Sequence, residues 1–279
     1  MSVDLLAFVR DIFSAALFNN WFAFVFAIII LLGTLSLGLI VVPEKFGRPA
    51  IRALAGVPLF FIFGGALDII LYALGVNIFV AGIFTVLIAA VLFGYAVKLK
   101  KIQGLLQKKE IAILVGLLLV GYLFMYFGWG ETKDGTIRAI SGSWADGVLH
   151  TLNAKAFKIR GSGDFSMPAY SGENFREPFG YDFVAGVFLS LGFTIGASFT
   201  LPAAALLASL LALSGNLTAM LVKMRGFVGN KLNIVIPAVV AGIFTVFASG
   251  LQWIVMPLIY KLWQTQKFFG IHDPVWDKQ

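Results

Sequence analysis

The residue of this chain best placed to do chemistry is Asp68, an acid in the middle of a long apolar stretch. Gly65 and Gly64 precede it by three and four residues, and Tyr72 follows it by four, so on a helix these residues share one face. Burying a carboxylate in hydrocarbon is costly, and acids inside membrane spans often belong to ion pathways. The spacing therefore predicts an ion-pathway site made of Asp68, Tyr72, Gly64 and Gly65.

Two interpretations of Asp68 remain open at this point. In the functional one, Asp68 binds a proton or a cation, with its carboxyl either ionised beside a partner or protonated. In the structural one, a neighbouring helix satisfies the carboxyl by hydrogen bonds, and the two glycines let that helix come close.

The elements that must position this acid are membrane helices. The chain has 279 residues, of which 59% are hydrophobic and 13% charged, and its mean hydropathy is +0.93. These values lie outside the range of soluble domains. A helical crossing needs roughly 20 apolar residues, and we expect an all-α, polytopic transmembrane bundle of about six spans. The expected spans are Trp21–Val42, Ile51–Val76, Ile78–Val97, Ile111–Gly130, Phe183–Leu213 and Asn233–Trp263.

The regions outside these spans differ in composition. Residues 1–20 have apolar positions at helical spacing and are expected to form an amphipathic interfacial helix. Residues 21–130 then form a four-span membrane half, 131–182 an extracytoplasmic loop or cap of about 50 residues, 183–263 two long spans, and 264–279 an extracytoplasmic tail. Aromatic residues in the cap favour an ordered structure, with short strands expected at Ile137–Ser141 and Ala156–Ile159.

The fifth and sixth apolar stretches are 31 residues each, which corresponds to about 46 Å of helix and exceeds the hydrocarbon thickness. Pro202 and Pro257 lie inside them and are the expected helix breaks, since proline removes a backbone donor. We favour kinked helices over a helix followed by a re-entrant piece.

Two further patterns concern helix packing and internal symmetry. Gly192 and Gly196 have the GxxxG spacing, which predicts close packing of one helix against another. The string VAGIFTV occurs at Val80–Val86 and again at Val240–Val246. This repetition is expected of inverted-repeat transporters, although short matches of common membrane residues also arise by chance.

Basic residues are concentrated in the loops on one side of the expected spans. The loops 43–52, 98–110 and 214–232 carry eleven basic residues and two acidic ones. Positive loops stay in the cytoplasm, so we expect a cell-membrane protein with both termini extracytoplasmic. One lysine cluster stands out as a docking site for anionic lipid or a partner protein. Its members are Lys98, Lys100, Lys101, Lys108 and Lys109.

The composition argues against most enzyme chemistry in the membrane. The chain has no cysteine, and its two histidines, His150 and His272, fall outside the spans. Haem, iron–sulfur and multi-histidine metal sites are therefore not expected, nor is a catalytic residue or any other cofactor. The net charge of +7 is explained by the membrane loops, so no nucleic-acid partner is expected.

These observations predict an integral membrane subunit of a channel, transporter or translocation apparatus, with Asp68 as a proton or cation site. The alternative is a non-catalytic scaffold subunit of a larger membrane complex of the energy-conserving or secretion type. In either case the expected partners are the lipid bilayer and other membrane subunits or further copies of this chain.

Overall fold

The computed structural model describes residues 17–126, 130–131, 137–138, 144–166, 168, 179–224, 236–237 and 239–241. Contacts divide the chain into two units, Met1–Leu213 and Ser214–Gln279. The second unit contributes only the end of one long helix and two short helical segments to the described part. The expected helix at residues 1–20, the sixth span with Pro257, and the tail lie outside the described residues or almost entirely so.

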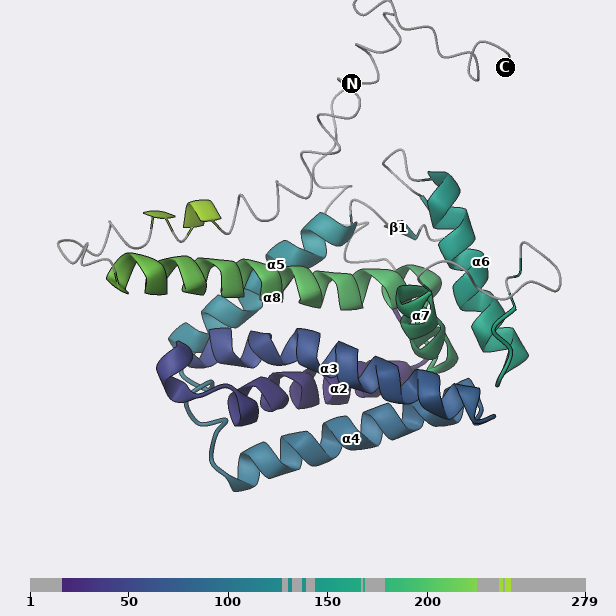
Figure 1. Ribbon diagram of the computed structural model, residues 1–279, viewed down its shortest axis with the longest axis horizontal. Coiled ribbons are helices and arrows are strands. Elements are labelled where there is room, and N and C mark those ends of the chain that lie inside the picture. Colours follow the sequence, from purple (N-terminus) through teal and green to yellow (C-terminus); the bar gives the residue numbers. More distant parts are fainter. Residues whose placement is uncertain are drawn as a thin grey trace, which may run out of the picture. The chain divides into compact units, whose positions relative to one another are not determined.

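Three helices form the base of the first unit (Figure 1): α2 at Trp21–Val41, α3 at Pro49–Ala73 and α4 at Ile78–Lys98. Helix α2 packs along both α3 and α4. Glycines make this packing close, because a Cβ at Gly38 would overlap the backbone of α3 and a Cβ at Gly33 would overlap Ala89 of α4. Gly56 of α3 approaches the carbonyl of Thr34 in the same way.

The ends of these helices are capped by side chains that the sequence places there. Asn20 accepts a hydrogen bond from the backbone of Ala23 and begins α2, and Asn77 does the same for α4 through Phe79. Arg52 is buried and donates to the carbonyls of Leu39 and Val42, where α2 ends. A buried guanidinium thus satisfies carbonyls that the helix itself leaves unpaired.

Helix α5 is at Lys108–Tyr126. The connection before it passes the start of α3, where a Cβ at Gly104 would lie 3.2 Å from the side chain of Pro49. The buried carboxylate of Glu110 accepts hydrogen bonds from the Arg48 side chain and from the backbone N–H of Ala50. Nearby, Lys101 pairs with Glu44 at 3.0 Å beside the short 3₁₀ helix η1 at Glu44–Phe46. The loops 43–52 and 98–110 therefore meet at one end of the bundle.

The region after α5 contains helix α6 at Trp144–Arg160 and two strands of two residues each, β1 at Gly130–Glu131 and β2 at Ile137–Arg138, which pair antiparallel. The first two residues of the strand expected at Ile137–Ser141 form β2, and residues 139–141 lie outside the described residues. The prediction of a strand at Ala156–Ile159 is wrong, because these residues form the end of α6. Leu152 and Ile159 are exposed on α6 while Ala154 and Phe157 are buried, which is a helical rather than an alternating pattern.

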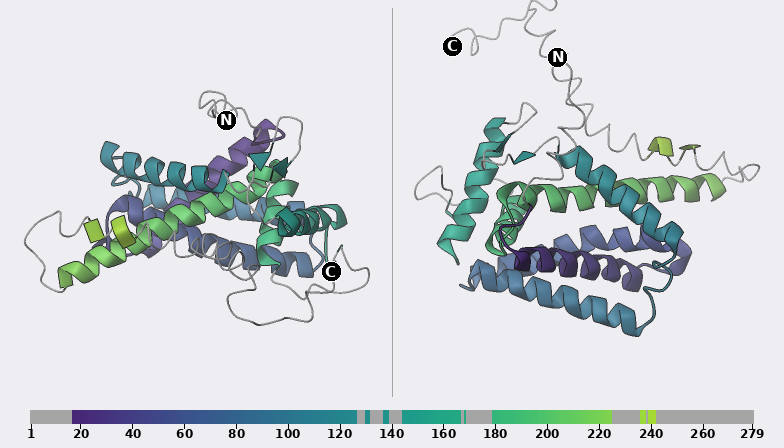
Figure 2. Two further views of the ribbon diagram at one scale, coloured as in Figure 1. Left: turned by 90° about the horizontal axis from the view of Figure 1, so that it is seen from above. Right: turned by 180° about the vertical axis from the view of Figure 1, so that it is seen from behind.

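The fifth apolar stretch forms two helices, α7 at Gly180–Ser190 and α8 at Ile195–Met224. The interruption falls at Gly192, whose φ of +94° is a left-handed conformation that favours glycine. Helix α8 continues through Pro202, so the proline does not end a helix. A kink within one helix, the interpretation favoured from the sequence, is compatible with this continuity. In Figure 2, α8 crosses α5, and at this crossing a Cβ at Gly121 would overlap the carbonyl of Ala204.

The break between α7 and α8 is paired with the segment before α2. Asn19 donates its backbone N–H to the carbonyl of Gly192, Thr194 donates its own to the carbonyl of Leu17, and Phe18 and Phe193 form a single antiparallel bridge. Irregular backbone is tolerated at membrane depth only where its polar groups find partners. The chain provides these partners from a segment far away in sequence.

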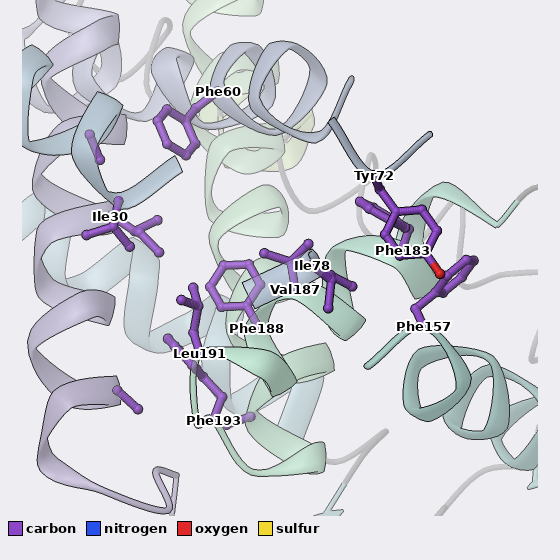
Figure 3. Packing of buried hydrophobic residues seen from close by; sticks show 14 residues of the cluster. Ile30, Phe60, Tyr72, Ile78, Phe157, Phe183, Val187, Phe188, Leu191 and Phe193 are labelled. Carbon is purple, nitrogen blue, oxygen red and sulfur yellow. The ribbon is translucent and has the colours of Figure 1, made fainter. Parts of the chain in front are cut away.

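The core of the first unit lies where α7 meets α2, α3 and α4. Figure 3 shows Phe188 and Val187 of α7, with Leu191 directly after this helix, between Ile30 of α2 and an aromatic group formed by Tyr72, Phe157 and Phe183. A second cluster joins α2 and α3 to α5 and α8 near the end where the basic loops meet.

Four described helices are long and apolar enough to cross a membrane: Trp21–Val41, Pro49–Ala73, Ile78–Lys98 and Ile195–Lys223. They indicate an α-helical membrane protein. Helix α5 corresponds to the fourth expected span, but Lys108, Lys109 and Glu110 occupy its first turn. The apolar helix α7 has only 11 residues and is too short to cross alone.

Candidate functional site

Asp68 is buried between α3 and α4 and is held there by one hydroxyl group. The carboxyl oxygens lie 2.7 and 2.8 Å from Oγ1 of Thr85, and both side chains are at least nine-tenths buried. Asp68 stands five residues before the end of α3, and Thr85 seven residues after the start of α4. The pair therefore joins the two helices about 10 Å from the turn that connects them.

A small cavity of about 20 Å³ adjoins the Asp68–Thr85 pair. Gly64 and Gly65 line it from α3, so these predicted site residues do lie beside the carboxyl. Space of this size holds about one water molecule. The rings of Phe60, Phe61 and Phe188 form much of the remaining wall.

Tyr72 does not join this site, although it lies one helical turn from Asp68. Its ring is buried against Phe157, Phe165 and Phe183, and its hydroxyl donates to the backbone carbonyl of Asp164 at 3.0 Å. The tyrosine thus fastens the C-terminal end of α3 to the turn after α6. We assign Tyr72 a packing role there rather than a place in an ion pathway.

The turn that receives Tyr72 is ordered by its own polar contacts. The carboxylate of Asp164 accepts a hydrogen bond from the backbone N–H of Ser166 at 2.7 Å and pairs with Arg160 at 3.2 Å. The hydrogen bonds from Ser166, assisted by the charge of Arg160, hold the pKa of this carboxyl below its usual range. The backbone N–H groups of Gly163 and Ile78 complete the junction by donating to Tyr72 and Gly161.

No cation neutralises Asp68 within the part of the chain that the structure describes. The described ion pairs involve Glu44, Glu110, Asp164 and Asp182 instead. The described residues also contain no group of three His, Asp or Glu side chains suited to a metal ion. Among the described residues, Asp68 is therefore a buried acid whose carboxyl contacts the hydroxyl of Thr85 and adjoins a small cavity.

Helix α7 closes the site from the side. Val184, Val187 and Leu191 line the cavity, and a Cβ at Gly82 of α4 would lie 3.0 Å from Leu191. Because Leu191 directly precedes the break at Gly192, the wall of the Asp68 cavity and the interruption of the fifth apolar stretch are adjacent.

The predicted GxxxG packing of Gly192 and Gly196 is wrong as a feature of one helix. Gly192 lies in the break, and Gly196 lies in the first turn of α8. Small residues that do bring the described helices together include Gly33, Gly38, Gly56, Gly121 and Gly186.

The lysine cluster lies at and around the connection between α4 and α5. Lys98 ends α4, Lys100 and Lys101 follow it, and Lys108 and Lys109 begin α5. Lys101 is engaged with Glu44, which holds the two basic loops together. The cluster is separated from Asp68 by most of the length of α3.

A second polar group lies between α6 and α7. The buried carboxylate of Asp182 is 2.7 Å from Nδ1 of His150 and accepts a hydrogen bond from the side-chain amide of Asn153 at 2.8 Å. These contacts fasten α6 to the first turn of α7.

Sequence reasoning found Asp68 but missed Thr85, His150, Asn153 and Asp182 as interacting residues. Thr85 had a detectable signal, since it is a hydroxyl residue within an otherwise apolar span. His150 and Asn153 contact Asp182 about 30 residues further along the chain, and no local sequence pattern predicts these contacts.

No model of a protein family matches this chain, and comparison with curated proteins and with solved structures gives no match either.

Proposed function

We propose that this protein is an integral membrane subunit that moves a proton or a small cation, with Asp68 and Thr85 as the binding site. The observation that carries the proposal is a carboxyl buried between two membrane helices, bound by a single hydroxyl and without a cationic partner among the described residues.

The hydrogen-bond geometry supports a site that exchanges a proton. Thr85 has one hydroxyl proton, which it can donate to one carboxyl oxygen only. The second short contact is satisfied if the carboxyl itself carries a proton and donates it to Oγ1. If Asp68 is protonated, both of its short contacts with the hydroxyl of Thr85 are hydrogen bonds. If Asp68 is ionised, its second oxygen needs a cation or a water molecule in the adjacent cavity.

Burial gives the same site a reason to bind positive charge. An isolated carboxylate in a low-dielectric interior costs several kcal/mol, which a proton or cation removes. The cavity beside Gly64 and Gly65 offers room for about one water molecule as an intermediate carrier. The surrounding phenyl rings would have to move for exchange, so we interpret this arrangement as a closed state.

The test is ion flux in liposomes that contain only this purified protein. With an imposed membrane potential and a pH-sensitive dye inside, the native protein should acidify or alkalinise the lumen faster than empty liposomes. Asp68→Asn keeps the shape and a hydrogen-bonding group but cannot release a proton, so we expect at least a tenfold loss of flux.

Ser209→Ala is the matched control for this experiment. Ser209 is equally buried and also joins two helices, because its hydroxyl donates to the carbonyl of Leu54 on α3. Loss of this hydroxyl should leave the flux unchanged. If Asp68→Asn conducts like the native protein, the proposed site is wrong. If the native protein is inert and co-purifies with stoichiometric partners, the scaffold alternative is favoured.

A further inference from the structure

A deep apolar groove lies between α2, α5 and α8. It adjoins the Asp68 cavity, because Ile30, Phe61 and Phe188 line both spaces. Its volume is about 500 Å³, within the range of pockets that hold small organic ligands. The walls come from all three helices, and representative residues are Ala27, Leu31, Leu118, Tyr122, Leu201 and Ala205.

The groove has an apolar floor and an open, apolar rim. Ile30, Phe188 and Phe193 line it and are almost fully buried, whereas Phe24, Ile28 and Val115 line it and are exposed. Thr34 also lines it, but the hydroxyl of Thr34 is buried within the protein. The groove is therefore continuous with the exposed apolar surface of the helices, which faces lipid in a membrane protein.

The dimensions of the groove match one leaflet of a bilayer. On α2 the lining residues extend from Phe24 to Thr34, a distance of about 15 Å at the rise of a helix. The hydrocarbon core is about 30 Å thick, so each leaflet contributes about half of it. The groove therefore runs along the helix for the depth of a single leaflet.

The groove is also narrow. A volume of about 500 Å³ over a length of about 15 Å gives a mean cross-section of roughly 33 Å² for the path open to the centre of a small atom group. A single hydrocarbon chain, whose atoms contact their neighbours at about 4 Å, fits this space.

We infer that the groove binds one acyl chain of a membrane phospholipid, taken from the leaflet on the side where α2 begins. An unfilled groove would deprive its floor of van der Waals contacts, and water would be unfavourable against walls of this kind. An acyl chain supplies those contacts and is present at high concentration wherever the protein resides.

The test uses the full chain in phosphatidylcholine vesicles that contain a trace of a phosphatidylcholine with a photoreactive diazirine in mid-chain. After irradiation, peptide mapping by mass spectrometry locates the labelled residues. We expect labelling of Leu31 and Leu118 to exceed that of the exposed α4 residues Leu87 and Val91 several-fold.

Two substitutions that fill the groove from opposite walls, Ala205→Phe and Ala27→Phe, should each lower labelling of the groove several-fold. Ala90→Phe makes the same change on the exposed face of α4 and should leave groove labelling unchanged. Testing both fillings protects the experiment against misfolding of one variant.

Equal labelling of the groove and of α4 would overturn the inference, because it would indicate only the general lipid contact of any membrane surface. Groove residues that remain unlabelled while α4 is labelled would also overturn it, since something other than lipid would then fill the space. Persistent groove labelling in both folded filling variants would have the same consequence.

Discussion

At the scale of single residues, Thr85 decides how Asp68 is held. Both carboxyl oxygens lie within 2.8 Å of the one hydroxyl, and no described basic side chain competes for them. The role of Asp68 therefore depends on a neighbour that can both donate and accept a proton.

Replacing Thr85 with Val should remove this partner while keeping the shape of the side chain. An unsatisfied buried carboxyl costs about 1–3 kcal/mol, so the free energy of unfolding in detergent should fall by about that amount, and ion flux should fall with it. Thr85→Ser keeps the hydroxyl and should retain most of both. Equal behaviour of the two variants would refute the assigned role of the hydroxyl.

The sequence predicted part of this site because an acid inside an apolar stretch is conspicuous. It grouped Gly64 and Gly65 with Asp68, since residues three and four apart share a helical face, and all three line one cavity. The same rule placed Tyr72 there and was wrong in this case, because the hydroxyl at the tip of a long side chain reached the turn at Asp164 instead. Helical spacing predicts a shared face, but tertiary contacts decide where a long side chain ends.

At the scale of elements, glycines set the distance between α2 and its neighbours. Gly38 faces the backbone of α3, which cannot move aside as a side chain would. The absence of a side chain at this position is therefore required for the observed packing.

Gly38→Ala should separate α2 from α3 and lower the free energy of unfolding by about 1–3 kcal/mol, the usual range for overpacking. Gly94→Ala on α4 is the matched control, because nothing lies within 4 Å of a Cβ there. This control should be neutral or stabilise the helix by up to about 1 kcal/mol. Thermal unfolding of both variants in one detergent checks the difference, and similar midpoints would contradict it.

The break between α7 and α8 depends on the conformation of Gly192. An alanine there would be strained by about 1–2 kcal/mol at positive φ, and its Cβ would lie 2.6 Å from the side chain of Asn20, which caps α2. Gly192→Ala should therefore destabilise the protein more than Gly75→Ala, where φ is +87° and the space is open. The free energies of unfolding of the two variants measure this difference. Equal values would show that the side chain of Asn20 moves aside without cost and would contradict the prediction.

The sequence located α2 to α5 to within a few residues, except that the fourth span was expected to end at Gly130 and α5 ends at Tyr126. Apolar runs bounded by Asn, Pro and Lys carry enough local information for this. It did not predict the break at Gly192, since the backbone partners of the break come from Leu17 and Asn19. Pro202 is the stronger local signal for a break, yet α8 continues through it, because one missing hydrogen bond is tolerated inside a membrane helix.

At the scale of the whole molecule, the orientation in the membrane is a prediction from charge. The contacts between Arg48 and Glu110 and between Lys101 and Glu44 bring two basic loops to one end of the bundle. Positive loops remain cytoplasmic, which would place that end inside the cell and α6 outside.

The absence of cysteine makes this orientation directly testable with single-cysteine variants. Lys158→Cys on α6 and Gln107→Cys before α5 both change exposed positions. In intact cells, a membrane-impermeant maleimide should label the first variant, and the second only after permeabilisation. The opposite pattern would reverse the proposed orientation, with the fold unchanged.

The pairing of Asn19 with Phe193 joins residues 174 positions apart, and this separation has a consequence for biosynthesis. The segment before α2 leaves the ribosome early and must wait for its hydrogen-bond partners until α7 has been translated. Bundle closure is thus a late event. A nascent chain arrested before Thr194 would leave the backbone N–H of Asn19 and the carbonyl of Leu17, both in the segment before α2, without these partners, a state that membrane quality control could recognise.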